Sequence, residues 1–331
     1  MIDKSELIEM LRNTDTYVSG QNICEHFEVS RNAVWKAINQ LRGDGYQIEA
    51  VSNRGYILVN TPDVLSKELI EENLKTDWAA RELICYAKTD STNTRIRRLS
   101  EEGLGHGALA VADVQTAGRG RRGRSWVAKA GVNISMSLLL RPEISPQKAP
   151  MLTLVMALAV ADSISELTGC DARIKWPNDI VIDGRKVCGI LTEMDLEADY
   201  IRNVIVGVGI NVNQASEDEF EEEFRDHAGS LRMAVGHPMT RAEIVASVMK
   251  YFEKYYSQFM QTTDLNLLKE LYSNRLINVE KMVTVLDPMG EYNGIAKGIT
   301  DTGELIVEKD DGTVINVFAG EVSVRGLYGY T

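Results

Sequence analysis

A run of arginines and glycines, Gly118 to Arg124, carries the clearest chemical signal in this sequence. Four arginines and three glycines occupy its seven positions, and Ser125 and Trp126 follow directly. Glycine lets a backbone approach a ligand closely, while guanidinium and exposed N–H groups bind carboxylates and phosphates. The run therefore predicts a cradle for an anionic ligand, although a solvated basic turn or a nucleic-acid patch has the same composition.

A second polar cluster, Asp90 to Thr94, lies between a strand-like segment at 83–86 and a helical stretch at 95–102. Such groups at the start of a helix usually serve as a cap, but this cluster offers more hydroxyls and amides than one cap needs. Gln115 adds a further amide just before the arginine run. These groups could bind the polar part of a ligand.

Two more motifs group a lysine with amides or carboxylates. Lys175 to Asp179 follows a predicted strand at 172–174, and its proline forces a turn. Residues 180–191 have the pattern of a tight hairpin, with Lys186 just after the turn. The segment 204–212 is a predicted buried strand whose glycines could admit a flat ligand, and Asn211 lies near its end.

These motifs need a folded domain around them. The arginine run is flanked by predicted strands at 109–114 and 132–140, so it is a loop within a domain and not a tail. Apolar residues from Ile244 to Phe259 form the stripe of a long core helix. Near the C-terminus, strand-like stretches at 282–286, 292–300, 305–308, 314–318 and 322–324 are separated by turn residues.

The first sixty residues predict a separate unit of three short helices and a hairpin. Apolar periodicity marks the helices, Ser19 and Ser30 are candidate N-caps, and a short turn joins the second and third helices. Strand-like segments at 46–51 and 56–59 follow. This pattern is typical of a winged helix-turn-helix, in which the third helix enters the major groove of DNA.

Several residues of this unit could contact DNA. Arginine and asparagine can bind base edges, and lysine can bind phosphate. Residues 1–60 hold six Lys and Arg against eight Asp and Glu, so bulk charge does not favour DNA and a protein-interaction module stays the alternative. The candidate DNA-binding residues are Arg31, Asn32, Trp35, Lys36, Asn39 and Arg54.

Composition sets further limits. The chain has 331 residues, a length that suggests two or three domains, and 44% of them are hydrophobic. Its net charge of −12 excludes a protein that generally coats nucleic acid. Its four cysteines form no Cys-x-x-Cys pair and fit a reducing cytoplasm. The start is too polar for a signal peptide, and the longest apolar run, Met151 to Ala161, suits a core helix better than a membrane span.

Taken in order, these motifs resemble the biotin–protein ligase family, over essentially the whole chain. The N-terminal unit makes the match specific to its bifunctional ligase and biotin operon repressor members. The resemblance implies an α+β multidomain chain. It comprises a winged helix-turn-helix at 1–62, a catalytic α/β domain like that of class II synthetases, with a mixed sheet, at 63–277, and a small β-barrel at 278–331. The segment Thr61 to Asp63 is the expected linker.

The resemblance also implies a reaction. Biotin and MgATP give biotinyl-5′-AMP and pyrophosphate, and a lysine of a biotin carboxyl carrier domain then takes the biotinyl group. Joining two anions requires their charge to be offset. At about 4 Å and an effective dielectric of about 20, one opposite charge is worth about 4 kcal/mol before desolvation. The resemblance further implies that the adenylate favours a homodimer that binds a two-fold operator.

Residue roles follow from the match to the family motifs. Arg121 and Lys186 would be catalytic, and Asp179 would also lie near Mg²⁺. The residues implied for biotin are Ser91, Thr92, Asn93, Gln115, Arg119, Gly120, Arg121 and Lys186. The residues implied for ATP are Lys175, Asn178, Asp179, Asn211 and Arg325.

One segment departs from the family pattern. The loop expected to cover the adenylate falls between Gln214 and Pro238 and contains the very acidic stretch 216–224. A tryptophan found there in some members is absent, although Phe220 or Phe224 could substitute for it. We expect a solvated loop. Two other functions remain open: a ligase of the same fold for lipoate or octanoate, and a ligand-sensing transcription factor without ligase activity.

Overall fold

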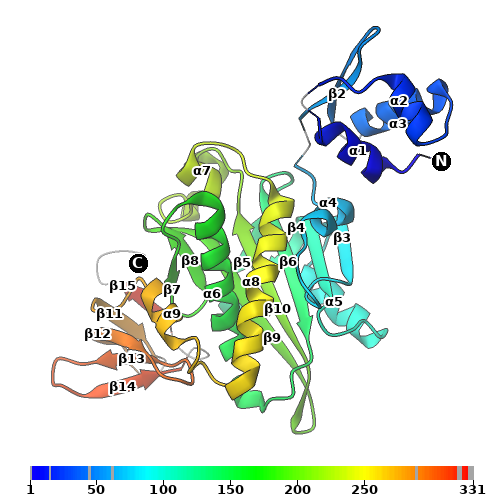
Figure 1. Cartoon of the computed structure of the whole chain (residues 1–331). Coiled ribbons are helices and arrows are strands. Elements are labelled where there is room, and N and C mark those ends of the chain that lie inside the picture. Colours follow the sequence, from blue (N-terminus) through cyan, green and yellow to red (C-terminus); the bar gives the residue numbers. More distant parts are fainter. Residues whose placement is uncertain are drawn as a thin grey trace. The chain divides into compact units, whose positions relative to one another are not determined.

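The computed structural model describes residues 2–14, 16–43, 46–60, 63–287, 290–318 and 323–326. Two compact units separate at Asp63, and each is described by itself (Figure 1). The expected linker at Thr61 to Asp63 lies outside the described residues except for Asp63. One helical segment, Pro146–Thr168, is long and apolar enough to cross a membrane by length and composition, but two thirds of it are buried in the core.

The first unit has the helices and the hairpin that the sequence predicts. Helices α1 (Lys4–Arg12), α2 (Gly20–His26) and α3 (Arg31–Gly43) precede the antiparallel strands β1 (Gln47–Val51) and β2 (Gly55–Asn60). Ser19 caps α2 by accepting a hydrogen bond from the backbone N–H of Asn22 at 3.0 Å. Leu7, Leu11, Ile23, Val34 and Ile38 form its buried core.

The second unit is built on a mixed sheet of eight strands. They are β3 (Leu83–Thr89), β4 (Leu109–Arg119), β5 (Ser125–Ala128), β6 (Asn133–Leu140), β7 (Arg173–Lys175), β8 (Asp179–Ile182), β9 (Arg185–Glu197) and β10 (Tyr200–Asn211). Their order is β3-β4-β6-β10-β9-β8-β7, with β5 paired to β4. Only the β3–β4 pair is parallel among the described strands. The predicted mixed sheet is therefore confirmed.

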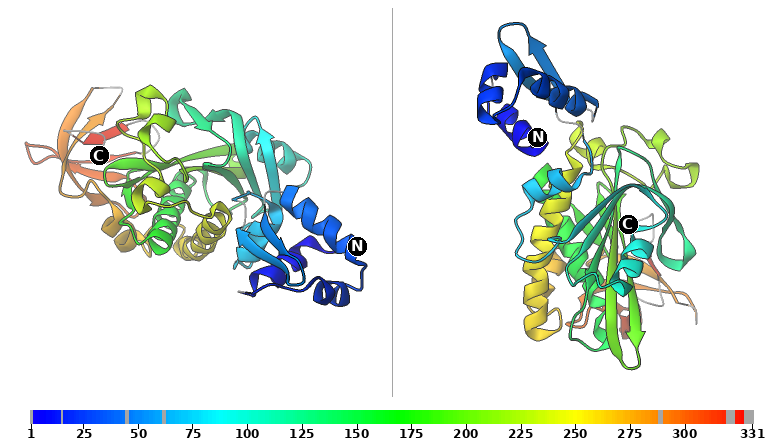
Figure 2. Two further views of the ribbon diagram at one scale, coloured as in Figure 1. Left: turned by 90° about the horizontal axis from the view of Figure 1, so that it is seen from above. Right: turned by 90° about the vertical axis from the view of Figure 1, so that its right-hand side faces the viewer.

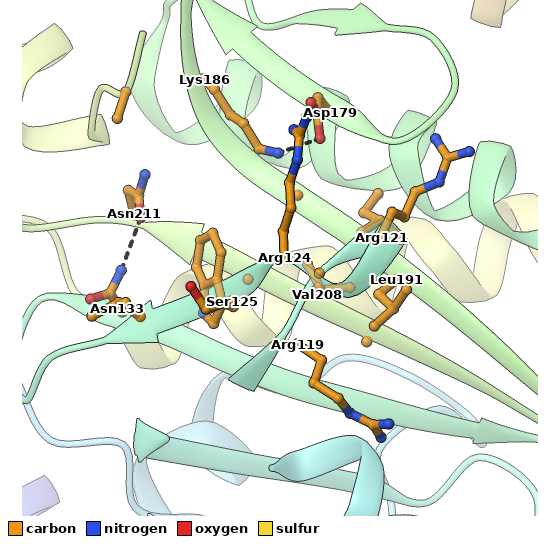
Figure 3. A pocket seen from close by; sticks show the side chains of 18 of the residues that line it. Arg119, Arg121, Arg124, Ser125, Asn133, Asp179, Lys186, Leu191, Val208 and Asn211 are labelled. Carbon is orange, nitrogen blue, oxygen red and sulfur yellow. Dashed lines mark hydrogen bonds and ion pairs between the residues drawn. The ribbon is translucent and has the colours of Figure 1, made fainter. Parts of the chain in front are cut away.

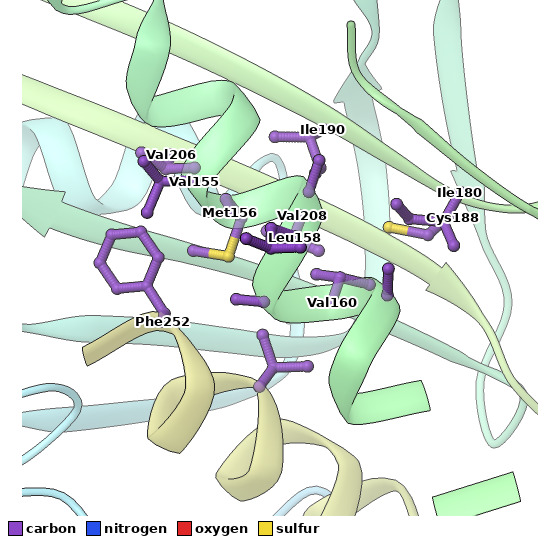
Figure 4. Close-up of a cluster of buried hydrophobic side chains, with 14 of the residues drawn as sticks. Val155, Met156, Leu158, Val160, Ile180, Cys188, Ile190, Val206, Val208 and Phe252 are labelled. Carbon is purple, nitrogen blue, oxygen red and sulfur yellow. The ribbon is translucent and has the colours of Figure 1, made fainter. Parts of the chain in front are cut away.

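Two long helices cover one face of this sheet. Figures 1 and 2 show α6 (Met151–Thr168) and α8 (Arg241–Thr262) side by side on it. Valines of β10 point toward these helices, and Figure 4 shows Val206 near Val155 of α6 and Phe252 of α8. The unit also contains the short helices α4 (Lys67–Asn73), α7 (Leu231–Val235) and α9 (Lys269–Arg275).

The opposite face of the sheet carries helix α5 (Thr92–Glu101). A small separate cluster joins Ile96 of this helix to Ala110, Leu139 and Ile205 of the strands. Because side chains alternate across a strand, Gly207 and Gly209 share the face of Ile205. The two glycines therefore lie on the α5 side of the sheet, not on the α6 side.

The C-terminal strands form a five-stranded antiparallel sheet. They are β11 (Met282–Leu286), β12 (Tyr292–Ile299), β13 (Leu305–Glu308), β14 (Val314–Val317) and β15 (Ser323–Gly326), in the order β14-β13-β12-β11-β15. The predicted barrel is corrected here: within the described strands β14 and β15 are the two edges, and the sheet does not close. Its buried residues join the core of α6 and α8, so this sheet has no core of its own.

Candidate active site

One cavity of about 860 Å³ gathers the predicted site residues (Figure 3). It takes side chains from strands β4 to β10, from the start of α5 and from the loops between them. The predicted biotin and ATP residues that line it are Ser91, Thr92, Asn93, Gln115, Arg119, Gly120, Arg121, Lys175, Asn178, Asp179, Lys186 and Asn211. Arg325 pairs with Thr284 through its backbone, and its side chain lies outside the described part of the chain.

A buried hydrogen-bond network forms one end of the cavity. The side-chain oxygen of Gln115 accepts from the backbone N–H of Thr92 at 2.7 Å and lies 3.0 Å from its hydroxyl. The hydroxyl of Ser137 lies 2.6 Å from both the Thr92 hydroxyl and the Asn93 side-chain oxygen. With its oxygen occupied, Gln115 offers its NH₂ group as a donor. Ser91 stands at the N-cap position of α5, yet its side chain makes no cap hydrogen bond in the structure.

The two glycines of β10 leave space that two other side chains of the protein occupy. A Cβ at Gly207 would lie 2.3 Å from Oδ1 of Asn93, and one at Gly209 would lie 2.4 Å from Cε2 of Trp126. The indole of Trp126 also donates to the hydroxyl of Ser135 at 3.2 Å. The glycines thus allow an amide and an indole to lie against the strand, and the indole lines the cavity.

The arginine run leaves β4 and makes a tight turn before β5. The backbone N–H of Gly120 donates to the carbonyl of Arg124 at 2.7 Å, and Arg122 adopts a left-handed conformation with φ of 56°. Arg121 points its guanidinium at Asn178, 2.9 Å from Oδ1. Burial lowers the pKa of Arg121 below its usual range. Four arginines of this run line the cavity, and guanidinium groups in such an arrangement can bind an anion.

Lys186 and Asp179 form an ion pair on another wall. The Lys186 ammonium lies 2.6 Å from Oδ1 of Asp179, and Figure 3 marks the pair. Asp183 and Gly184 both have positive φ values, 49° and 76°, which form the tight hairpin turn between β8 and β9. This turn fixes where Lys186 leaves the strand. Asn178 adds its amide, which donates to Asp179 at 3.2 Å and to the carbonyl of Ile190 at 3.1 Å.

Asn211 is held by the protein on both sides of its amide. Its oxygen accepts from Nδ2 of Asn133 at 2.9 Å, and its NH₂ donates to the carbonyl of Gly229 at 3.0 Å (Figure 3). Asn133 in turn accepts from the backbone N–H of Lys129 at 3.0 Å. The chain of bonds ties the loop before β6 to the segment that follows the acidic stretch.

The acidic stretch is mostly exposed, as expected of a solvated loop, but it also forms a wall of the cavity. Phe220 and Phe224 are half-buried and line the cavity together with Glu219, Glu221 and Glu223. Ion pairs of Glu217 with Arg185 at 2.5 Å and of Asp218 with Arg225 at 3.8 Å hold the stretch in place. Its carboxylates are mostly exposed, while its aromatic rings cover the site.

Sequence reasoning named no site role for five residues that the structure brings to this region. Trp126 and Asn133 line the cavity, and the other three hydrogen-bond to residues that line it. Single Ser, Asn and Glu residues within strands form no recognisable motif in the sequence. Only Trp126 stands next to such a motif, the arginine run. The five residues are Trp126, Asn133, Ser135, Ser137 and Glu193.

Most of the six candidate DNA-binding residues of the first unit are exposed; five of the six lie on α3, and Arg54 lies at the turn between β1 and β2. Val34 and Ile38 of α3 face its core, which leaves the predicted contact residues outward. Trp35 is 56% exposed, unusually open for a tryptophan. Arg31 donates to the side chain of Gln21 at 3.2 Å. The exposed positions in this set are Arg31, Asn32, Trp35, Lys36 and Arg54, and Asn39 is half-buried.

Family models match three parts of the chain. Residues 4–57 match a helix-turn-helix domain, 86–211 the biotin/lipoate A/B protein ligase family, and 279–325 the biotin protein ligase C-terminal domain. The bifunctional ligase/repressor BirA of Bacillus subtilis is 39% identical over 97% of this chain and 98% of its own length. The protein of the same name from Escherichia coli is 30% identical over 97% and 96%.

A solved structure matches the second unit. The biotin protein ligase from Aquifex aeolicus, in complex with biotin and ATP, is 31% identical with a TM-score of 0.65. The match covers 74% of this chain and 99% of that one. Sequence and structure therefore agree that this chain belongs to the biotin–protein ligase family, among relatives named bifunctional ligase/repressor.

Proposed function

We propose that this chain joins biotin to ATP, transfers the biotinyl group to a lysine of biotin carboxyl carrier domains, and represses transcription when it carries the adenylate. The observation that carries the ligase proposal is one cavity with a polar end at Thr92 and Gln115 and a cationic end at Arg121 and Lys186. Biotin has the matching polarity, with a ureido group at one end and a carboxylate at the other.

The polar end suits the ureido ring. The NH₂ of Gln115 can donate to the ureido carbonyl, and the hydroxyl of Ser91 can donate or accept. The hydroxyl of Thr92, which donates to Gln115, can accept. Trp126, lying against Gly209, offers an apolar surface for the bicyclic ring. These groups favour biotin over lipoate or octanoate, which would need a long apolar tunnel.

The cationic end suits the first reaction step. A carboxylate oxygen of biotin attacks the α-phosphorus of ATP, a P–O bond forms, and the bond to pyrophosphate breaks. This step needs no protein nucleophile, but it needs positive charge near both anions. We assign that role to Arg121 and Lys186, and we assign Arg119 to biotin binding. We assign Lys175, Asn178, Asp179 and Asn211 to the nucleotide, with Arg325 as a further candidate.

The second step needs an entering amine. The amine of the acceptor lysine attacks the acyl carbon, the C–O bond to AMP breaks, and the amine loses a proton. Phe220 and Phe224 of the acidic wall can shield the activated intermediate from water before the acceptor arrives.

The proposed site can hold magnesium through a single protein carboxylate. The described residues contain no group of three or more His, Cys, Asp or Glu side chains suited to hold a metal. Asp179 offers one carboxylate, and Mg²⁺ in nucleotide sites often takes one or two carboxylates, with phosphate oxygens and water as the other ligands. When bound, Mg²⁺ would neutralise phosphate charge, and Asp179 would hold it.

Pyrophosphate release tests the ligase proposal. The full chain with MgATP should release pyrophosphate when biotin is added. Release with lipoate and not with biotin would point to the other ligase of this fold. Release with neither ligand, together with ligand-dependent DNA binding, would point to a transcription factor that only senses its ligand.

The repressor proposal rests on the first unit and its exposed contact surface. One copy has no excess of positive charge, so it should bind DNA weakly, whereas a dimer presents two recognition helices to a two-fold operator. The adenylate must bind the dimer more tightly than the monomer to shift this equilibrium. Sedimentation and gel shifts, with and without biotin plus ATP, test the link, and equal operator affinity in both states would contradict it.

We also propose a division of labour along the chain. Residues 1–62 would bind DNA, 63–277 would hold biotin and ATP, and 278–331 would complete the nucleotide site. The four free, scattered cysteines are consistent with action in the cytoplasm.

A further inference from the structure

Glu193 does not line the cavity itself but contacts two residues that do, Asn93 and Arg119. It belongs to β9, where it pairs with Ile205 of β10, and its side chain is 22% exposed. Its carboxylate accepts from Nδ2 of Asn93 at 2.8 Å. Nη2 of Arg119 lies 3.4 Å from one carboxylate oxygen and 3.5 Å from the other. One acidic side chain thus joins the polar end of the cavity to the start of the arginine run.

The carboxylate decides which way the Asn93 amide faces. A carboxylate only accepts hydrogen bonds, so the NH₂ group of Asn93 must point at Glu193 and its oxygen at Ser137. Asn93 is 5% exposed and lies against Gly207, so water cannot easily replace this partner. The oxygen of Asn93 then accepts the hydrogen bond from Ser137, which also contacts Thr92.

The same carboxylate holds Arg119. This arginine is the last residue of β4, and the tight turn of the arginine run begins directly after it. Its side chain is 48% exposed, and besides Glu193 its guanidinium contacts the hydroxyl of Thr94 at 3.4 Å. Glu193 therefore fixes the base of the loop on the side of the cavity where α5 begins.

A neighbouring ion pair offers a matched comparison. Arg97 of α5 lies 3.5 Å from Glu193, but its Nε bonds to Asp195 at 3.0 Å. Asp195 stands two residues after Glu193 on the same strand and shares Arg97 with it. Among the described residues, neither Asn93 nor Arg119 donates a hydrogen bond to Asp195. The two carboxylates thus differ in whether they touch the cavity walls.

We propose that Glu193 is a positioning residue for biotin, acting through Asn93 and Arg119. The proposal rests on the ligase function above. Neutralising Glu193 loosens the Asn93 amide and releases Arg119, so the polar end no longer presents a single arrangement of donors and acceptors. Lys186, on a different wall, keeps its ion pair with Asp179, so the charge at the reacting centre is unchanged. The effect therefore falls on biotin binding and not on the rate at saturation.

The test compares Glu193→Gln with Asp195→Asn in the full chain. Biotin affinity is measured by calorimetry without ATP, and pyrophosphate release is measured at saturating ATP. Glu193→Gln should raise the Kd and KM for biotin roughly tenfold, as loss of a charged hydrogen bond implies, with kcat within about threefold of the parent. Asp195→Asn should keep both constants close to the parent values.

Three outcomes distinguish the proposal for Glu193 from the ligase function on which it rests. Parent-like biotin affinity in folded Glu193→Gln overturns the proposal for Glu193 and leaves the ligase function intact. A fall in kcat with unchanged KM assigns Glu193 to the chemical step and also overturns it. If the parent itself neither binds biotin nor releases pyrophosphate, the ligase function fails.

A second variant covers the case in which Glu193→Gln does not fold. Asn93→Ala removes the amide that Glu193 orients and leaves the carboxylate paired with two arginines. It should raise the biotin Kd to a similar extent, and in a double variant the two changes should be less than additive. Unchanged biotin affinity in Asn93→Ala overturns the proposal, as does full additivity.

Discussion

The ammonium of Lys186 lies 2.6 Å from Oδ1 of Asp179, across the hairpin that joins β8 to β9. Their side chains are 29% and 14% exposed, so the pair sits at the cavity wall and not in bulk solvent. A Cβ at Gly189 would lie 3.1 Å from the end of Lys186, which shows how closely the lysine follows its own strand. An entering anion must therefore compete with Asp179 for this lysine or share it.

Replacing Lys186 with glutamine should lower the rate of adenylation by about 10²–10³-fold, because the charge beside the developing anion is lost. Pyrophosphate release measures this rate directly. Lys88→Gln, which removes an exposed lysine of β3, should leave the rate at the parent level. Parent-like adenylation in Lys186→Gln would move the role to another cation, such as the buried Lys175.

Changing Arg121 to glycine should weaken retention of the adenylate by about 1.5–3 kcal/mol, which corresponds to roughly 10–100-fold in affinity. The guanidinium at Asn178 is then gone, and activated biotin should leak onto lysines of bystander proteins. Rapid filtration of the labelled adenylate measures its release. Arg121→Lys keeps the charge but lacks the planar guanidinium, so its retention of the adenylate should lie between that of the parent and that of Arg121→Gly. Parent-like retention in Arg121→Gly would exclude this role.

Gly209→Ala should destabilise the protein by about 1–3 kcal/mol and weaken biotin binding, because the new methyl group overlaps the indole of Trp126. Thermal melting and biotin titration measure the two effects. Gly105→Ala is the control, since a Cβ there meets only Glu82 at an ordinary 3.6 Å. If Gly209→Ala bound biotin like the parent, Trp126 would not be part of the ring site.

Stability should fall on mild acidification because of His106. Desolvation lowers the pKa of His106, and its Nδ1 accepts from the backbone N–H of Arg141 at 2.9 Å. The unfolded chain, with a histidine pKa of about 6.5, then binds a proton more readily than the folded chain. The contribution of His106 is therefore present above about pH 6.5 and lost as the pH falls through the folded value.

Replacing His106 with glutamine removes that proton uptake. Urea melts between about pH 7.5 and 5 should lose less stability in His106→Gln than in the parent, over the range where a histidine titrates. An identical loss in the two proteins would assign the pH dependence to other groups.

Local patterns were sufficient for the main elements and for most of the cavity. The small apolar segment before the arginine run and the alternation after it predicted strands where β4 and β6 lie. The turn residues at Asp183 and Gly184 predicted the hairpin that carries Lys186. These signals are local, because side-chain period and turn chemistry depend on neighbours in sequence. The order of the motifs then placed the site residues within one family.

Other features depend on partners distant in sequence. The glycines at 207 and 209 suggested a flat ligand, but their occupants are Asn93 and Trp126, which arrive from α5 and β5. The acidic stretch had the composition of a solvated loop, yet ion pairs with Arg185 and Arg225 hold it against the cavity. Likewise, five alternating strands predict a small sheet, but whether it closes depends on its edges.

Isolation of the intermediate tests the central claim most directly. The full chain is incubated with biotin, Mg²⁺ and ATP labelled at the α-phosphate, separated from free nucleotide, and its bound product is identified by mass. The account predicts biotinyl-5′-AMP retained by the parent and absent when biotin is omitted. A bound lipoyl or octanoyl adenylate formed in preference to the biotin product, or no adenylate with any of these acids, would contradict it.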